Sequence, residues 1–212
     1  MYKINKPVFS SVEFERKIMT HLRQRSGLQQ NRQYLGMSQI GKCPRLLYEQ
    51  WFAGADGSDF SHRMAYTGYL HEWDVLNRLR EMGLAKLDRR EVVADFDDRL
   101  RGHTDGLTEW GDLLEIKSVS SHKFELVTYH ARALHEHIGQ VQLYMLYGGW
   151  RFTWFVYVNR ETFEHKVIRV PFSRTIADQQ VEKARFVLAK IDEHTNPPEC
   201  VCGRCEYKFA VE

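Results

Sequence analysis

Apolar residues recur at helical spacing in several parts of the chain, and these parts alternate with stretches typical of strands. A first helix is predicted over Ser11–Arg25, where the apolar positions lie three or four residues apart. A second is predicted within MSQIGKCPRLLYEQWF, because Pro44 fits a first helical turn and Cys43 would lie at its cap. A longer helix is predicted over about 62–82, with His71 on its apolar stripe.

The middle of the chain is predicted to form strands. RREVVADF, RGHTDGLTEW and GDLLEIKSVS are each typical of one strand. A helix over about 125–147, the strands RFTWFVYVN and FEHKVIRVPF, and a helix over about 173–194 follow. This order predicts an α/β fold with a mixed central sheet flanked by helices, in which the antiparallel part comes first.

Length and charge narrow the possibilities further. A chain of 212 residues can bury one substantial core, so a single domain is expected. The apolar runs are too short to span a membrane, and the amino terminus lacks the apolar core of a signal peptide, so we expect a cytoplasmic protein. A net charge of +2 neither requires nor excludes a nucleic-acid partner. Without a Gly-x-x-x-x-Gly-Lys loop, a nucleotide-driven motor is not expected.

Candidate chemistry is concentrated in the predicted hairpin GHTDGLTEWGDLLEIKS. A three-residue turn over 109–111 would be closed by Gly111, which tolerates the left-handed conformation found there. The resulting register places Asp105 opposite Glu115 across the two strands. Lys117 is two residues beyond Glu115 and therefore points to the same face.

Two carboxylates and an ammonium group on one face, among apolar neighbours, cost free energy unless they have a purpose. Paired carboxylates suit Mg²⁺ or Mn²⁺, which retain waters and bind substrate phosphates. The cation would activate a water, and Lys117 would position that water and neutralise charge on the phosphate. Hydrolysis of a phosphodiester is the expected chemistry. On spacing alone, an exposed hairpin with a surface ion pair between Asp105 and Lys117 stays open.

Two further residues favour an active site. The imidazole of His71 should point at the sheet, although a histidine in such a place is more often an ordinary core residue. Gln140 shares a predicted helix face with Tyr144 and Tyr147, and its amide needs a partner there. A metal-bound water or a phosphate would supply that partner, and a bond to the backbone is the alternative.

Taken together, these motifs resemble the RecB-like branch of the PD-(D/E)XK nucleases, which have a restriction-endonuclease-like fold. The matching segments are GYLHEWDV, GHTDG, LLEIKS and the Gln-x-x-x-Tyr motif, which contain His71, Asp105, Glu115, Lys117, Gln140 and Tyr144. The resemblance implies a metal held by His71, Asp105, Glu115 and the main-chain carbonyl of Ile116. It also implies that Lys117 serves the attacking water, while Gln140 and Tyr144 support the DNA and the shell of the active site.

The chain has four cysteines, Cys43, Cys200, Cys202 and Cys205. In a reducing cytosol such a cluster is more often a metal site than a disulfide framework. One early and three late cysteines resemble the iron–sulfur subset of these nucleases, which includes the CRISPR-associated RecB-like exonucleases. That resemblance implies a 4Fe–4S cluster. The late spacing is tighter than usual, so zinc stays open as the alternative, with unliganded cysteines third.

The expected organisation is one nuclease domain over 1–212. Its core would span about 60–195, and a small helical lobe of about 27–59 with 196–212 would be tied by the four-cysteine site. The resemblance, which extends to phage-encoded exonucleases, implies a metal-dependent DNA exonuclease acting on single-stranded ends. It would act in recombination, repair or CRISPR adaptation, together with a protein partner from the same pathway. The alternative is a non-catalytic iron–sulfur DNA-binding partner in a larger complex.

Overall fold

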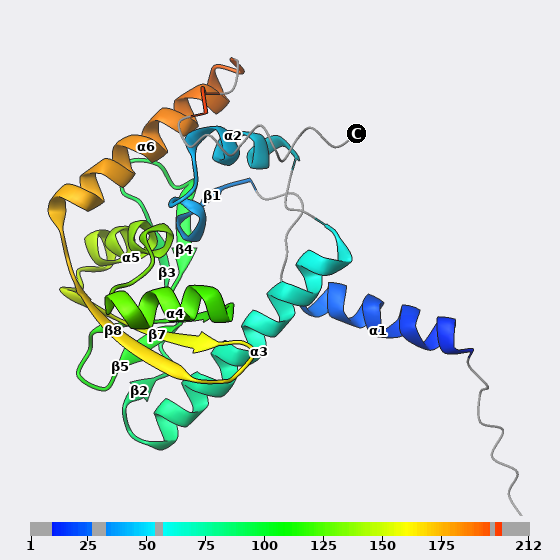
Figure 1. The fold of residues 1–212 in the computed structure, drawn as a ribbon. Coiled ribbons are helices and arrows are strands. Elements are labelled where there is room, and N and C mark those ends of the chain that lie inside the picture. Colours follow the sequence, from blue (N-terminus) through cyan, green and yellow to red (C-terminus); the bar gives the residue numbers. More distant parts are fainter. Residues whose placement is uncertain (1–9, 27–32, 54–56, 196–197, 201–212) are drawn as a thin grey trace, which may run out of the picture.

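The computed structural model describes residues 10–26, 33–53, 57–195 and 198–200. Figure 1 shows the arrangement of the elements. The helices are α1 (Ser11–Arg25), η1 (Met37–Gln39, a 3-10 helix), α2 (Pro44–Ala53), α3 (Asp59–Glu81), α4 (Ser121–His130), α5 (His135–Gly148) and α6 (Arg174–Asp192). The strands are β1 (Leu35–Gly36), β2 (Ala85–Lys86), β3 (Glu91–Val93), β4 (Leu100–His103), β5 (Gly106–Thr108), β6 (Leu113–Val119), β7 (Phe152–Asn159) and β8 (His165–Pro171).

Serine side chains fix the beginnings of the long helices. The hydroxyl oxygens of Ser10, Ser58 and Ser173 each accept a hydrogen bond from a backbone N–H of the first turn of α1, α3 and α6. Such a cap satisfies an N–H that has no partner within the helix. These helices and α2, which begins at Pro44, lie close to their predicted ranges.

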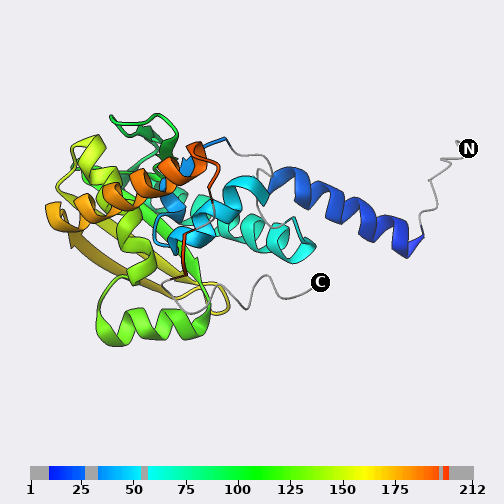
Figure 2. The same cartoon turned by 90° about the horizontal axis from the view of Figure 1, so that it is seen from above.

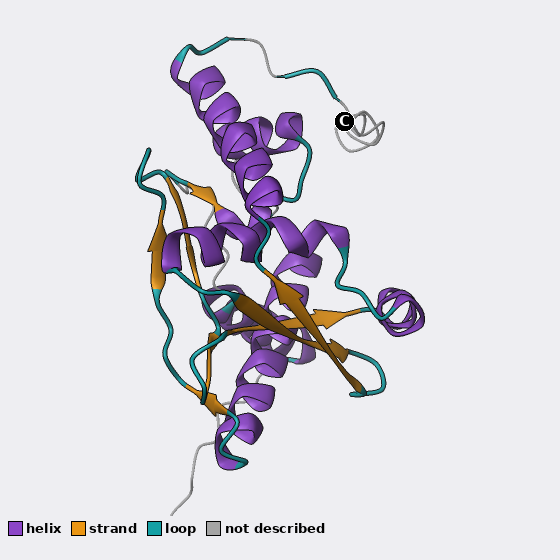
Figure 3. Ribbon diagram, turned by 90° about the vertical axis from the view of Figure 1, so that its left-hand side faces the viewer, coloured by secondary structure: helices purple, strands orange, loops and turns teal. Residues whose placement is uncertain are grey.

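The strands form two sheets, whereas the sequence predicted one. The five-stranded sheet has the order β2–β5–β6–β7–β8, in which β6 and β7 are parallel and the other neighbours are antiparallel. The three-stranded sheet has the order β1–β4–β3. Helices lie on both sides of the strands (Figure 3), which confirms the expected α/β class with flanking helices.

Each face of the five-stranded sheet is covered by a different helix layer. On one face Val75 and Leu76 of α3 pack against Leu114 and Ile116 of β6. On the other face lies the larger core, to which β6, β7, α2, α5 and α6 all contribute. The central strand β6 is therefore buried from both sides, and any polar group on it must find a partner within the protein.

The segment predicted as one strand, RGHTDGLTEW, is divided between the two sheets. It forms β4 and β5, which are separated at Thr104 and Asp105. The backbone N–H of Thr104 donates to the carbonyl of Arg90 (3.0 Å), and the Thr104 hydroxyl accepts from the Arg90 N–H (3.0 Å). These bonds hold the chain where it passes from one sheet to the other, and Asp105 follows directly.

The predicted single helix over 125–147 is also wrong. It consists of α4 and α5, and the break follows Ala131, which has a left-handed backbone with a φ of 48°. The N–H of Leu134, just before α5, donates to the hydroxyl of Tyr157 at 3.0 Å. The Tyr157 hydroxyl on β7 thus accepts a hydrogen bond from a backbone N–H that has no partner within α5. Because α5 runs in a different direction from α4, Gln140 reaches Glu115 on β6.

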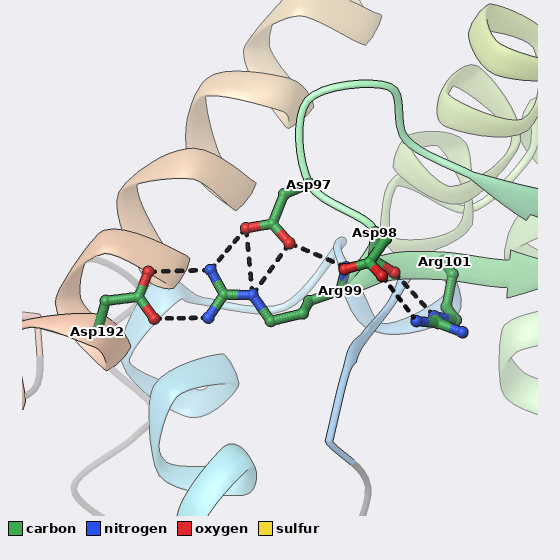
Figure 4. Close-up of polar contacts among 5 residues, drawn as sticks. All are labelled: Asp97, Asp98, Arg99, Arg101 and Asp192. Atoms are coloured by element: carbon green, nitrogen blue, oxygen red, sulfur yellow. Dashed lines mark hydrogen bonds and ion pairs between the residues drawn. The ribbon is translucent and has the colours of Figure 1, made fainter.

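Arg99 connects the loop between β3 and β4 to the far end of α6 (Figure 4). Its guanidinium lies 2.6 Å from the Asp97 carboxylate and 2.5 Å from that of Asp192. The hydrogen bond from Arg99 holds the pKa of Asp97 and that of Asp192 below their ordinary values. This network fastens the three-stranded sheet to α6.

Helix α1 projects from the body of the molecule (Figures 1 and 2). It is attached at its carboxyl end to α3, where Arg23 pairs with Asp59 at 2.6 Å and the Ser26 hydroxyl lies 2.6 Å from Nδ1 of His62. None of the helices in the described parts of the chain combines the length and the apolar composition needed to cross a bilayer.

Candidate active site

The predicted hairpin is confirmed. Gly111 has a φ of 92°, and the Thr108 N–H donates to the Asp112 carbonyl at 2.9 Å, which closes the three-residue turn. Asp105 is thereby placed opposite Glu115, one position beyond the last strand pair. One oxygen of Asp105, Oδ2, accepts a hydrogen bond of 2.7 Å from the backbone N–H of Ile116. Asp105 lies where the chain passes from one sheet to the other, and its carboxylate therefore points toward β6.

Glu115 is the most deeply buried carboxylate of the site, with 1 % of its side chain exposed. Its Oε1 accepts from Nζ of Lys117 at 2.6 Å and from Nε2 of Gln140 at 2.7 Å. Its Oε2 is also buried and has no hydrogen-bond partner among the described residues. Burial, followed by the nearby Asp105 charge, raises the pKa of Glu115 to about 8 against the pull of Lys117.

Burial also raises the pKa of Asp105, while the positive charge of Lys117 opposes the shift. For Lys117, burial lowers the pKa, but the surrounding carboxylates outweigh burial and the net direction is upward. The ammonium group is therefore kept charged at the cavity. The hairpin predicted two carboxylates and an ammonium group on one face, and the structure places these three groups together, with Glu115 buried and Asp105 half-buried.

Gln140 and Tyr144 form a chain of hydrogen bonds that orients Glu115. The Gln140 amide donates to Glu115 and also to the Tyr144 hydroxyl (3.2 Å), and that hydroxyl donates to the carbonyl of His103 (2.8 Å). The partner of Gln140 is thus the carboxylate of Glu115, which neither sequence alternative named. The close contact depends on Gly102, because a Cβ atom there would lie 2.6 Å from the Tyr144 oxygen.

These residues surround a cavity of about 210 Å³. Its lining brings together all five predicted catalytic side chains, Asp105, Glu115, Lys117, Gln140 and Tyr144. The opposite wall comes from the segment around β1 and from β4, and includes Tyr34, Ser38, Arg101 and His103. The guanidinium of Arg101 lies 5.3 Å from the ring centre of Tyr34, so this wall supplies a positive charge opposite the carboxylates.

His71 lies elsewhere. Its Nδ1 is 2.7 Å from the Ser118 hydroxyl, and its ring meets that of Phe163 edge-on. Ser118 alternates with Lys117 along β6 and so points to the other face of the sheet. Burial lowers the pKa of His71, with Arg160 adding to the effect. These contacts match the alternative of a core histidine, and the role of His71 as a metal ligand stays a prediction.

Glu72, the next residue on α3, is the carboxylate that sequence reasoning missed. Burial and then the Asp105 charge raise its pKa to about 7, whereas Arg89, with which it pairs, lowers it. Glu72 therefore belongs electrostatically to the Asp105–Glu115 cluster. The sequence contained one indication that Glu72 could lie near the sheet. Glu72 follows His71, which was expected to point at the sheet, and neighbouring helical residues differ by only about 100° in direction.

The donor set fits a hard divalent cation such as Mg²⁺ or Mn²⁺. No three histidine, cysteine, aspartate or glutamate side chains within the described ranges are already gathered in metal-binding geometry. Two carboxylates nevertheless meet at the cavity, and the unpartnered Oε2 of Glu115 needs a positive partner. Oxygen ligands of this kind suit both ions. The main-chain carbonyl of Ile116 stays a predicted ligand.

A second hydrogen-bonded chain lies on the other side of Lys117. Tyr157 is the partner of Lys117 in the β6–β7 pair, and its buried hydroxyl lies 3.0 Å from Nδ1 of His137. Since this hydroxyl accepts from Leu134 and Nε2 of His137 faces the Glu136 carboxylate at 3.7 Å, we assign the hydroxyl proton to Nδ1 and the imidazole hydrogen to Nε2. Burial and then Lys117 lower the pKa of His137 to about 3, which keeps this ring neutral.

The predicted four-cysteine site is only partly within the described residues. Cys43 is buried directly before α2, and Cys200 is half-buried. Cys202 and Cys205 lie outside the described residues. The four-cysteine centre therefore stays a prediction.

Comparisons with known proteins identify the fold. Neither a protein-family model nor a curated protein matches the sequence. The alkaline exonuclease LHK-Exo from Laribacter hongkongensis matches with a TM-score of 0.58 and 14% identity over 77% of this chain and 90% of that one. LHK-Exo in complex with dAMP gives 0.59 and 16% over 82% and 92%, and SSO0001 gives 0.58 and 17% over 84% and 87%. The chain therefore shares the fold of an alkaline exonuclease.

Proposed function

We propose that this protein is a metal-dependent DNA exonuclease of the PD-(D/E)XK type. The observation that carries the proposal is the buried Glu115 carboxylate, which has one oxygen held by Lys117 and Gln140 and the other without a partner. Such a group is costly in a core unless a cation or a substrate completes it. The fold shared with an alkaline exonuclease supports the same reaction class.

In the proposed reaction, Asp105 and Glu115 hold Mg²⁺ or Mn²⁺. The bound cation would supply a water of lowered pKa and neutralise charge on the phosphate. Lys117 faces the same cavity with a half-buried ammonium group, which stabilises negative charge that develops as the phosphodiester is attacked. Gln140 and Tyr144 keep the Glu115 carboxylate in one orientation, so that the site needs little reorganisation during the reaction.

Glu72 is proposed as a further member of the acidic cluster. The charges of Asp105 and Glu72 both raise the pKa of Glu115, and the charge of Asp105 also raises the pKa of Glu72. Glu72→Gln is expected to lower cleavage and to weaken the dependence on metal concentration. Asp74→Asn is the matched control, because it neutralises a carboxylate of the same helix that pairs with Arg78 at the surface, and it should leave both cleavage and metal dependence unchanged.

The substrate is proposed to be DNA with a single-stranded end, and the setting to be recombination, repair or CRISPR adaptation in the cytoplasm. These finer statements follow the resemblance to RecB-like nucleases and do not depend on a described contact. A protein partner from the same pathway is part of this proposal.

Cleavage of end-labelled DNA tests the activity. Single- and double-stranded substrates are incubated with Mg²⁺ or Mn²⁺ and either the wild type or Lys117→Ala. We expect progressive shortening from one end by the wild type and a loss of about 100-fold or more in the variant. Lys190→Ala is the matched control, because Lys190 pairs with Glu193 on α6. Equal activity of wild type and Lys117→Ala would remove Lys117 from the mechanism.

The alternative proposal is a non-catalytic DNA-binding partner in a larger complex. It predicts that the wild type binds DNA but leaves it intact with either metal. Binding without cleavage by protein whose cysteine site is filled would favour this alternative.

We also propose that Cys43, Cys200, Cys202 and Cys205 bind a 4Fe–4S cluster, with zinc as the alternative. The end of α6 supports this, because the Tyr48 hydroxyl on α2 donates to the Thr195 carbonyl at 2.5 Å and the rings of Phe52 and His194 are in contact. The chain that leads to the late cysteines therefore starts beside the helix that follows Cys43. Anaerobically purified protein should contain iron and sulfide, with Cys43→Ser losing them. Stoichiometric zinc alone would select the alternative.

A further inference from the structure

One face of α3 carries large apolar side chains that remain exposed. Tyr69, Leu70 and Trp73 are 44%, 43% and 57% exposed, while Val75 on another face of the same helix is buried against the sheet. A helix that has already buried one face gains nothing from a second apolar stripe in a monomer. Exposed apolar patches of this kind typically mark a binding surface.

This stripe borders a groove of about 420 Å³ between α3 and the segment that follows β2. Its described lining consists of Tyr69, Leu76, Leu87 and Asn77 with Trp73, Arg80 and Arg89. Neither aspartate nor glutamate occurs among these lining residues. The groove thus combines two aromatic rings with two guanidinium groups, which are the groups that hold single-stranded nucleic acid.

The α3 groove is connected to the candidate active site. Arg89, which lines it, pairs with Glu72 at the edge of the acidic cluster. Beyond Arg80 the adjoining hollow contains Glu81 and Glu109 together with Lys86, which pairs with Glu109, so its carboxylates offset the positive charges there, whereas the α3 groove has two arginines and no carboxylate in its lining. A polyanion is therefore better accommodated in the α3 groove than in the adjoining hollow, and Arg89 places one end of the groove beside Glu72.

We propose that the α3 groove binds the unpaired strand of the DNA substrate next to the site of cleavage, with Trp73 and Tyr69 stacked on bases and Arg80 bound to a phosphate. The proposal rests on the proposed nuclease function and specifies its substrate. Stacking on an aromatic side chain requires an accessible base face, which a duplex hides within its own stack. The α3 groove thus gives a physical reason for a single-strand preference.

A second copy of this chain suits the α3 groove less well. A two-fold contact places the same surface of each copy against the other, so that the arginines of both copies would be brought into one interface. Like charges in such an interface oppose association. A single strand brings phosphates to the same guanidinium groups and bases to the same rings.

Binding of oligothymidylate of about 20 nucleotides in EDTA tests the α3 groove, since this length exceeds the ~4–16 nucleotides covered by a single-strand-binding fold. We expect Trp73→Ala to raise the Kd at least about fivefold and Trp73→Phe to retain most of the affinity. Arg80→Gln should reduce the slope of log Kd against log salt by about 0.7. Phe186→Ala, which removes an exposed aromatic from α6, is the matched control and should bind as the wild type does.

A blunt hairpin duplex provides the second arm. Trp73→Ala should leave its Kd unchanged, and an equal loss on duplex and single strand would overturn the stacking assignment. An unchanged Kd for the single strand would overturn the proposal outright. Loss of self-association in Trp73→Ala with unaltered DNA binding would overturn it too, and would make the α3 groove an interface between copies. Unfolding curves of each variant establish that it is folded.

Cleavage separates this proposal from the proposed function. With Mg²⁺, Trp73→Ala should lose activity on the long oligonucleotide and much less on one of about four nucleotides, which is too short to occupy both the α3 groove and the active site. Suppose that the wild type cleaves both oligonucleotides and that the ratio of activity on the long one to activity on the short one is the same in Trp73→Ala. The groove proposal then fails and the nuclease proposal stands. If the wild type cleaves neither, the nuclease proposal fails, and the binding measurements in EDTA still decide the groove.

Discussion

Glu115 combines three properties that a core carboxylate seldom has together. It is buried, it is paired with Lys117, and one of its oxygens is left without a partner within the described residues. In the absence of metal, burial and the Asp105 charge favour its protonated form. In the protein alone, a proton on Glu115 offsets the negative charge that burial and the neighbouring Asp105 make unfavourable.

The first prediction concerns pH. The pKa of Glu115 is about 8 in the folded protein and near its ordinary 4.5 in the unfolded chain, so between these values the folded state binds more protons. Stability of the metal-free protein should thus fall as pH rises from about 5 to about 8, with Tm decreasing by roughly 3 °C or more. Glu115→Gln, which cannot ionise, should lose most of this dependence. Thermal unfolding in EDTA across this range is the measurement.

Tyr157 gives a second prediction at this scale. Tyr157→Phe removes the oxygen that accepts from the Leu134 N–H and that donates to His137. The free energy of unfolding should fall by about 1–3 kcal/mol, because a backbone donor at the start of α5 loses its partner. Tyr129→Phe, whose ring is largely exposed, is the control. Nitrogen NMR of the wild type should find the His137 hydrogen on Nε2, and the Nδ1–H form would contradict the assignment.

The sequence identified Asp105, Glu115 and Lys117 because one hairpin relates all three. Turn length and strand alternation are local rules, and together they determine which side chains share a face. Glu72 was missed for a different reason. Its position depends on how α3 is rotated over the edge of the sheet, and adjacent helical positions differ by only about 100°. No local rule distinguishes it from His71.

At the scale of elements, the site depends on how closely α5 approaches β4. Gly102 of β4 lies beneath the Tyr144 hydroxyl, and this contact sets the position of Gln140 and so of Glu115. A side chain on that strand position would push the helix outward. The spacing between two secondary-structure elements is thus a condition for the orientation of the carboxylate.

Gly102→Ala tests that spacing. The new Cβ would lie 2.6 Å from the Tyr144 oxygen, so we expect a loss of about 1–3 kcal/mol in unfolding free energy together with reduced cleavage. Gly68→Ala is the control, since a Cβ at that position of α3 meets nothing within 4 Å. That variant should gain about 0.5–1 kcal/mol, because alanine is the better helix former. Urea unfolding of both variants is the measurement. An unchanged free energy of unfolding in Gly102→Ala would show that α5 can shift to accommodate the added methyl group.

The elements were predicted with uneven success for physical reasons. The helices with serine caps and the strands β7 and β8 have their determinants within the segment itself. The break between α4 and α5 is not determined within its own segment. It depends on the Tyr157 hydroxyl, which is more than twenty residues away in the chain. The division of RGHTDGLTEW into β4 and β5 likewise depends on Arg90, which lies outside that segment.

At the scale of the whole molecule, Arg99 is the link between the three-stranded sheet and α6 (Figure 4). Arg99→Ala should reduce the free energy of unfolding by about 1–2 kcal/mol, since the guanidinium holds Asp97 and Asp192 at once. Arg99→Lys should recover little, because an ammonium cannot form the same paired bonds. Arg174→Ala breaks an exposed pair with Asp178 and should cost less than about 0.5 kcal/mol. Equal losses in Arg99→Ala and Arg174→Ala would mean that the network has no special role.

The parallel pairing of β6 with β7 has a consequence for synthesis. Leu113 pairs with Thr153, so forty residues, among them α4 and α5, must be synthesised before β6 can pair with β7. Pairings of such sequence separation form slowly, because the entropy of closing the loop is lost first. The hairpin that contains Asp105 and Glu115 emerges from the ribosome well before Gln140 does. A growing chain therefore displays Asp105 and Glu115 before Gln140 and Tyr144 exist to orient them, so the ordered candidate site can form only after most of the core has been translated.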